Sequence, residues 1–244
     1  MKKVGGKHLL RVNRKKQLKA LAMEKIHQLI YSSDSTVPME FGPVINEFAD
    51  TFLEDESIFE HLNEAYRQKL ASLDLFSQGI DISYRKEHHV HTITYLNQQF
   101  SLDDATYVKF LSSSIEIMRE VLPLGSVVEL DPNFFKPDPS SSKPVKVVIK
   151  GRFIAPKGYQ SYFPYAGVVY PLGEIKKDRV IYFTYPLIKS VVHVGFKDEM
   201  EESFELLMKK EMIVDKGMKS IEFSSEDMKK LQSEMNPEVK AGER

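Results

Sequence analysis

The sequence predicts an α+β protein on the basis of three observations. Apolar residues recur at helical spacing through the first 76 residues and again after residue 199. Residues 80–96 and 122–196 instead contain short runs of β-branched and aromatic side chains, separated by Pro, Gly and Ser. We therefore expect a helical region with a β-hairpin over residues 1–120, a small β domain over 121–200, and C-terminal helices with a polar tail over 201–244.

Composition and charge limit the classes of function. The 244 residues are 42% hydrophobic, which is enough for a core, and the lack of Cys excludes disulfides and a cysteine nucleophile. No signal peptide or apolar run of membrane-spanning length is evident, so we expect a cytoplasmic protein with no membrane span. Residues 1–19 carry eight bases and no acid. This basic arm could bind nucleic acid, but without interleaved aromatic residues we expect a solvated terminus.

Three helices are predicted before residue 80. The first spans residues 18–30 and ends at the polar turn "SSDST". Pro43 is placed to begin the second, and Ser57 with Glu60 forms the capping signature of a third. The helical period of the third continues until Gly79, where we expect it to stop.

The next segment changes period. "IDISYR" and "VHTITYL" flank the polar "KEHH", which predicts a β-hairpin over residues 80–96. Ser101 with Asp104 then predicts the cap of a helix over residues 102–120.

The hairpin contains the one cluster that suggests a metal. Within "EHHVH", the side chains of Glu87, His89 and His91 would share a face if all three lay on one strand. The spacing differs from the H-x-x-x-H of helical metal sites, and no fourth ligand is evident. No nucleotide-binding or hydrolase motif occurs either. We assign no catalytic residue, metal or cofactor and expect a non-enzymatic protein, with a metal-dependent enzyme at this strand as an alternative.

Residues 122–196 predict five short strands: "GSVVEL", "VKVVIKGRFI", "YAGVVYPLG", "RVIYFTY" and "SVVHVGF". Five short strands favour a strongly bent antiparallel sheet or an SH3-like barrel. The Pro-rich segment 131–144 is typical of an extended loop. Gly125 and Gly195 fall at strand ends, where a bent sheet requires a positive φ or a close backbone approach.

Aromatic residues are concentrated in this β domain. A small sheet does not readily bury so many on one face, so we expect some to reach the surface. Core packing is the favoured interpretation of these residues, with anchoring of a protein partner as the alternative. The partner-binding candidates are Tyr162, Phe163, Tyr165, Tyr170, Tyr182 and Tyr185.

The C-terminal region predicts two more helices. The acids of "DEMEE" precede an amphipathic helix over about residues 199–212, where the helix dipole explains them better than catalysis does. Ser224 with Asp227 predicts the cap of a short second helix. These helices could bind the β domain or a partner.

Four segments occur in an order that resembles a known pattern: "LPLGSVVEL", "VVIKGRFI", "YAGVVYPLGEI" and "SVVHVGFKDEMEESF". They are similar to an uncharacterised family, a domain of unknown function found in Firmicute gene clusters for type VII (ESX-like) secretion. The resemblance covers residues 121–205 and brings no catalytic residues with it. It implies a non-enzymatic accessory protein of a secretion or toxin cluster, acting as chaperone, adaptor or neutralising partner. The implied partner is a protein encoded nearby, a secreted toxin or its helical targeting partner, with nucleic-acid binding through the basic arm as an alternative.

Overall fold

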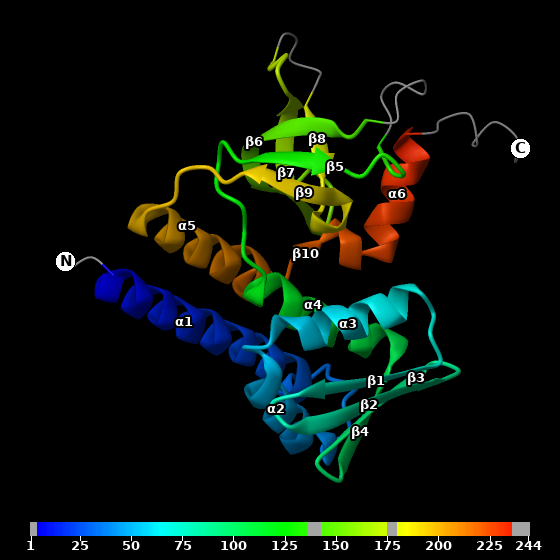
Figure 1. Ribbon diagram of the computed structural model, residues 1–244. Helices are drawn as coiled ribbons and strands as arrows, with labels where there is room; N and C mark the ends of the chain where they lie inside the picture. The colour runs from blue at the N-terminus through cyan, green and yellow to red at the C-terminus, as the bar shows by residue number, and fades with distance from the viewer. Residues whose placement is uncertain (1–3, 136–142, 175–179, 236–244) are drawn as a thin grey trace, which may run out of the picture. The chain divides into compact units, whose positions relative to one another are not determined.

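The computed structural model describes residues 4–135, 143–174 and 180–235, and for residues 4–13 it describes the backbone alone. The predicted α+β class is confirmed (Figure 1). The chain forms two compact units. Unit 1 comprises Met1–Arg119 with Lys209–Asp215, and unit 2 comprises Glu120–Met208 with Lys216–Arg244.

Unit 1 contains four α-helices and a π-helical turn among its described residues. Every fourth residue of the first helix is buried from Leu18 through Ala22 and Ile26 to Ile30, so one stripe packs inward against the fourth helix. The elements are α1 (Val4–Tyr31), α2 (Phe41–Phe52), α3 (Glu56–Arg67), α4 (Asp104–Met118) and η2 (Lys210–Asp215).

The sheet of unit 1 is a four-stranded antiparallel meander: β1 (Ser72–Ser77), β2 (Ile80–Glu87), β3 (Val90–Tyr95) and β4 (Gln98–Asp103). Its buried face is covered by helices, as Figure 1 shows for α3 and α4. The Phe48 ring of α2 packs edge-on against Tyr95 of β3 and Phe100 of β4. The core of unit 1 therefore lies between this sheet and the helices.

The predicted hairpin is confirmed as β2 and β3, but the sequence reading missed the outer strands. The third helix ends at Arg67 and does not continue to Gly79, because Lys69 takes a left-handed φ of 57° that a helix cannot propagate. The predicted caps are also wrong by two residues. Asp55 caps α3 and Asp103 caps α4, each accepting a backbone N–H with its carboxylate.

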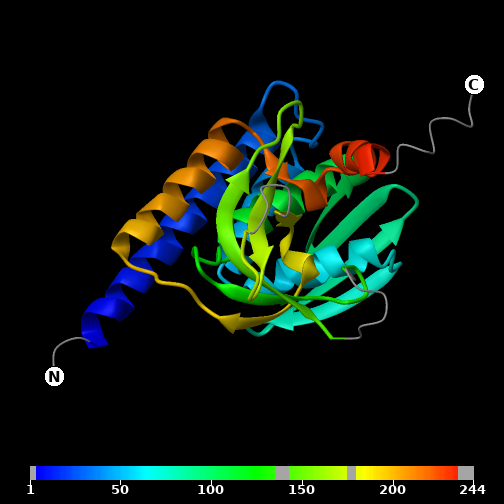
Figure 2. The ribbon, with the colours of Figure 1, turned by 90° about the horizontal axis from the view of Figure 1, so that it is seen from above.

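Unit 2 is built on a bent sheet with the strand order β10-β7-β6-β5-β9, in which β8 also pairs with β7 (Figure 2). All five predicted strands occur in order, and the bent sheet is confirmed, whereas the sheet does not close into a barrel. The sixth strand was missed because it has two residues and runs parallel to β7. The strands are β5 (Val127–Leu130), β6 (Val145–Ile154), β7 (Ser161–Val169), β8 (Ile181–Phe183), β9 (Ile188–His193) and β10 (Lys219–Ser220).

Short helices complete unit 2: η1 (Tyr185–Leu187), α5 (Glu199–Lys209), η3 (Ile221–Phe223) and α6 (Ser225–Met235). The last residue of α5, Lys209, belongs to unit 1. Ser224 caps α6 as predicted, with its hydroxyl accepting the Asp227 N–H at 3.3 Å. The Asp227 carboxylate instead accepts the backbone N–H of Gln160 at 3.0 Å, which ties α6 to the start of β7.

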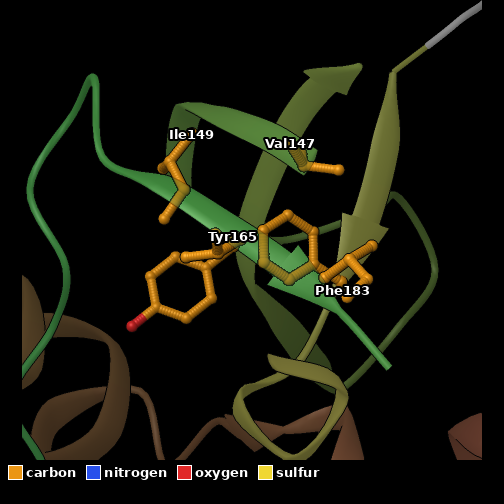
Figure 3. Packing of buried hydrophobic residues seen from close by; sticks show 6 residues of the cluster. Val147, Ile149, Tyr165 and Phe183 are labelled. Atoms are coloured by element: carbon orange, nitrogen blue, oxygen red, sulfur yellow. The ribbon is translucent and has the colours of Figure 1, made fainter. Parts of the chain in front are cut away.

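One face of the bent sheet forms the core of unit 2. Figure 3 shows Val147, Ile149, Tyr165 and Phe183 pointing toward one another. Gly167 lies among them, and a Cβ there would overlap the Val147 side chain and come within 3.3 Å of the Phe183 ring. The glycine therefore makes room for two buried side chains.

Candidate protein-binding surface

The first and last strands of the predicted β domain are joined by a buried serine. The Ser126 hydroxyl donates to the Pro123 carbonyl at 2.7 Å and accepts the Gly195 N–H at 2.9 Å. A Cβ at Gly195 would overlap the carbonyl oxygen of Leu124 and lie 2.9 Å from the Ser126 nitrogen. Gly125 turns the chain here with a φ of 79°. The segment just before β5 is therefore hydrogen-bonded to the segment just after β9.

Charged side chains attach α5 to the sheet. Arg152 of β6 is almost fully buried and forms a two-point ion pair with Glu201, one arm of which joins Nη2 to Oε2 at 3.1 Å. Its guanidinium lies 5.0 Å from the centre of the Phe204 ring. Glu205 is also buried and accepts the backbone N–H of Val121 at 3.3 Å. The face of α5 toward the sheet is therefore polar.

The outer side of α5 carries exposed apolar residues, and Phe204 stands at its border with the face toward the sheet. Met200 is 80% exposed, Leu207 60% and Phe204 41%, whereas Glu205 and Lys209 are buried. The Lys209 ammonium donates to the carbonyls of the last turn of α4, at Ile117 (2.8 Å) and beyond it at Arg119 (2.6 Å). Helix α5 thus reverses the usual arrangement, in which a surface helix buries its apolar stripe.

The exposed apolar residues continue back along the chain into β9. This strand lies at an edge of the sheet, and all its residues except the first are exposed. Among the described residues, seven of the nineteen large exposed hydrophobic side chains fall between residues 191 and 207. We call these seven the 191–207 apolar segment: Val191, Val192, Val194, Phe196, Met200, Phe204 and Leu207.

The six aromatic candidates divide into two groups. Tyr170, Tyr182 and Tyr185 are exposed, whereas Tyr162, Phe163 and Tyr165 are buried and follow the core-packing interpretation. Tyr165 lies against Phe183, and its hydroxyl accepts the Leu122 N–H at 3.2 Å. The number of aromatic residues in the segment cannot separate the two groups. Exposure depends on which residues lie within a strand and on whether other elements cover the face that each side chain occupies.

The histidine segment does not lie on one strand, so the condition under which Glu87, His89 and His91 would share a face is not met. Glu87 ends β2, His89 is in the turn, and His91 is on β3 and fully buried. His91 Nδ1 lies 2.9 Å from the Tyr84 hydroxyl and its Nε2 lies 2.7 Å from one Asp104 oxygen. The other Asp104 oxygen lies 2.6 Å from Nδ1 of the exposed His89.

Electrostatics favour a neutral imidazole in this cluster. Burial lowers the pKa of His91, so Nε2–H donates to Asp104 while the Tyr84 hydroxyl donates to Nδ1. Hydrogen bonds from His91 and then His89, together with nearby Lys86, lower the pKa of Asp104 to about 2. Both nitrogens of His91 are thus engaged, and across the residues that the structure describes no group of three His, Cys, Asp or Glu side chains could hold a metal. The cluster joins the start of α4 to the hairpin.

Other predicted features yield no binding geometry. Side chains of the basic arm before residue 14, loop residues 136–142 and the tail after 235 lie outside the described residues. Lys19, at the end of the arm, pairs with Asp50 at 2.9 Å. A cavity beside the Glu60–Arg119 ion pair in unit 1 holds about 10 Å³, room for a single water. Within the described ranges, no helix has the length and apolar character needed to cross a bilayer.

The comparisons identify one family. Residues 121–204, about a third of the chain, match the model of a family described as a domain of unknown function (DUF4176). The match lies within unit 2 and contains β5 to β9 and the first half of α5. No curated protein and no solved structure matches the chain. The predicted resemblance of this stretch to an uncharacterised domain is thereby confirmed, and the match assigns no activity.

Proposed function

We propose that this chain is a non-enzymatic accessory protein that acts by binding another protein. The observation that carries this proposal is the 191–207 apolar segment, which concentrates exposed hydrophobic side chains on one edge strand, the helix that follows it and the connection between them. Exposed hydrophobic side chains that gather in one part of a protein are a common mark of a protein-binding surface.

Covering this segment would contribute favourable free energy to the binding of a partner. Complete burial of a Val, Leu, Met or Phe side chain contributes about 1.5–3 kcal/mol, and these side chains are already about half-buried on average, so each adds roughly 1 kcal/mol. Seven such side chains supply several kcal/mol before the cost of association, which is the scale that anchors protein interfaces.

The setting that we propose is a type VII secretion or toxin cluster. There the protein would act in the cytoplasm as chaperone, adaptor or neutralising partner of a protein encoded nearby. Support comes from the four segments whose order resembles the family of such clusters, and the last of them, "SVVHVGFKDEMEESF", supplies most of the 191–207 apolar segment. Exposed Tyr170, Tyr182 and Tyr185 are a second candidate group of anchors on the same unit.

Site-specific photo-cross-linking in the source cells tests this function. A photoreactive phenylalanine analogue replaces Val192 or Phe196 in the full chain, and Phe76, which is 70% exposed in unit 1, serves as the matched control. We expect one discrete protein adduct from positions 192 and 196 and none from position 76. The same analogue at Tyr182 shows whether the interface extends to the exposed tyrosines. Adducts of equal yield at the control position, or none at 192 and 196, would contradict the proposal.

A further inference from the structure

We propose that the exposed stripe of α5 docks an amphipathic α-helix of a partner protein, and that this helix carries basic residues beside its apolar face. The stripe consists of Met200, Phe204 and Leu207. This inference rests on the proposed function and adds to it the secondary structure and the charge of the partner.

The outward direction of the stripe is fixed by what lies behind it. Arg152 holds Glu201 and the Val121 N–H holds Glu205, and both contacts lie within unit 2. Turning α5 to bury its apolar stripe would break both of these contacts and leave charged groups such as the Arg152 guanidinium buried without partners. The stripe is therefore a stable feature of the fold that faces solvent.

The spacing of the stripe suits a helical partner. Residues 200, 204 and 207 stand at i, i+4 and i+7, which forms a ridge that fits between the side-chain rows of a second helix. An extended partner would instead have to add to the edge strand β9. The pairing of β9 with β5 contains two register shifts, so the edge is irregular and a poor template for a further strand.

The charges beside the stripe determine the charge of the partner. Residues 198–205 contain five acids and no base, and two of these acids, Glu201 and Glu205, are engaged within the unit. Asp198 and Glu199 are exposed at the first turn of α5, next to Met200, whereas Glu202 is half-buried and lies on the side of the helix away from the stripe. Lys or Arg beside the apolar face of an incoming helix would pair with these carboxylates, whereas an anionic lipid surface or nucleic acid would be repelled.

A set of synthetic peptides tests the inference on the full-length protein. The first peptide is an amphipathic helix with a Leu stripe and Lys flanks, the second has the same stripe with Glu flanks, and the third is an extended peptide of alternating Val and Thr. Fluorescence anisotropy of labelled peptides measures the affinity. We expect the Lys-flanked helix to bind at least ten-fold more tightly than either of the others.

Matched variants connect that binding to the stripe. Met200→Ser/Leu207→Ser should weaken binding of the Lys-flanked helix at least ten-fold, because it removes two exposed apolar contacts. Leu172→Ser alters a comparably exposed residue of the same unit outside the stripe and should leave the affinity unchanged. Equal urea midpoints for all proteins would show that both variants keep the fold. The charge-reversed variant Glu199→Lys should weaken the preference for the Lys-flanked over the Glu-flanked peptide.

Three results would overturn the inference. The first is tighter binding of the extended peptide that is lost on Val192→Lys, which would identify a strand as the partner and leave the proposed function intact. The second is no binding by any peptide, in which case cross-linking at Val192 and Phe196 still decides the proposed function. The third is a dimer that Met200→Ser/Leu207→Ser dissociates, which would show that a second copy covers the stripe.

Discussion

Replacement of His91 by Phe tests how much the buried polar cluster contributes to unit 1. The His91 ring stacks on Tyr107 with centroids 4.1 Å apart and planes 2° from parallel, and a Phe ring can keep this packing. The two polar contacts are lost. The Tyr84 hydroxyl then stays buried without a partner, at a cost of about 1–3 kcal/mol. Loss of the bond to half-exposed Asp104, discounted for solvent screening, adds about 1 kcal/mol. We expect His91→Phe to lower the free energy of unfolding by about 2–4 kcal/mol.

A second substitution separates the unpaired hydroxyl from lost packing. Tyr84→Phe alone removes one hydrogen bond and should cost about 1 kcal/mol. The double variant Tyr84→Phe/His91→Phe should be more stable than His91→Phe, because it contains no unpaired buried hydroxyl. Urea unfolding by circular dichroism measures all three, and amide hydrogen exchange of β2 and β3 localises the effect. A cost below about 0.5 kcal/mol for His91→Phe, or a double variant less stable than His91→Phe, would refute the reasoning.

Three further predictions use the same measurements. Gly195→Ala should destabilise unit 2 by more than about 2 kcal/mol, since its Cβ would overlap the loop backbone that closes on it, whereas Gly151→Ala meets ordinary contacts beyond 3.5 Å and should stay within about 0.5 kcal/mol. Lys209→Met should cost about 1–3 kcal/mol through the uncapped carbonyls of α4, and the exposed Lys210→Met should leave the urea midpoint nearly unchanged. Acid should destabilise the protein in two stages when urea midpoints are measured against pH. The folded-state pKa of His91 lies below 6.5, so its contribution is present above pH 6.5 and is lost as the pH falls through the lower folded value. The contribution of Asp104 is present above pH 3.8 and is lost as the pH falls toward about 2. Asp104→Asn should make this second stage smaller without abolishing it, because hydrogen bonds also lower the pKa values of Asp55 and Asp103.

The sequence was most informative where local pattern and burial agree. The strand predicted over residues 145–154 matches β6 residue for residue, because its alternation is regular and its inner residues Val147 and Ile149 are buried. Residues 72–77 were misread as helix because six residues are too few to separate a period of two from a helical one. Strand β10 could not be predicted, since two residues carry no period and their partner, β7, is nearly 60 residues away.

The candidate surface was only partly visible in the sequence. Helix α5 contains two regular stripes, one apolar and one formed by Glu201, Glu205 and Lys209, and a helical wheel cannot tell which of them is buried. In the folded protein, Glu201 neutralises the buried positive charge of Arg152, and this places the stripe that contains Glu201 toward the sheet. An arginine within the predicted strand over residues 145–154 was the available signal, and its partner could be identified only once the chain had folded.

Residues 209–215 belong to unit 1, and this has consequences for proteolysis and for gene recombination. Since residues 216–235 rejoin unit 2, no single peptide bond separates the two units. After a single proteolytic cleavage, at least one fragment still contains residues of both units. A gene fragment that ends at residue 204 would lack Ile221 and Phe223, which are buried beside β7. Recombination that transferred the family-matched stretch alone would deliver an incomplete fold, so we expect natural selection to have acted on the two units together.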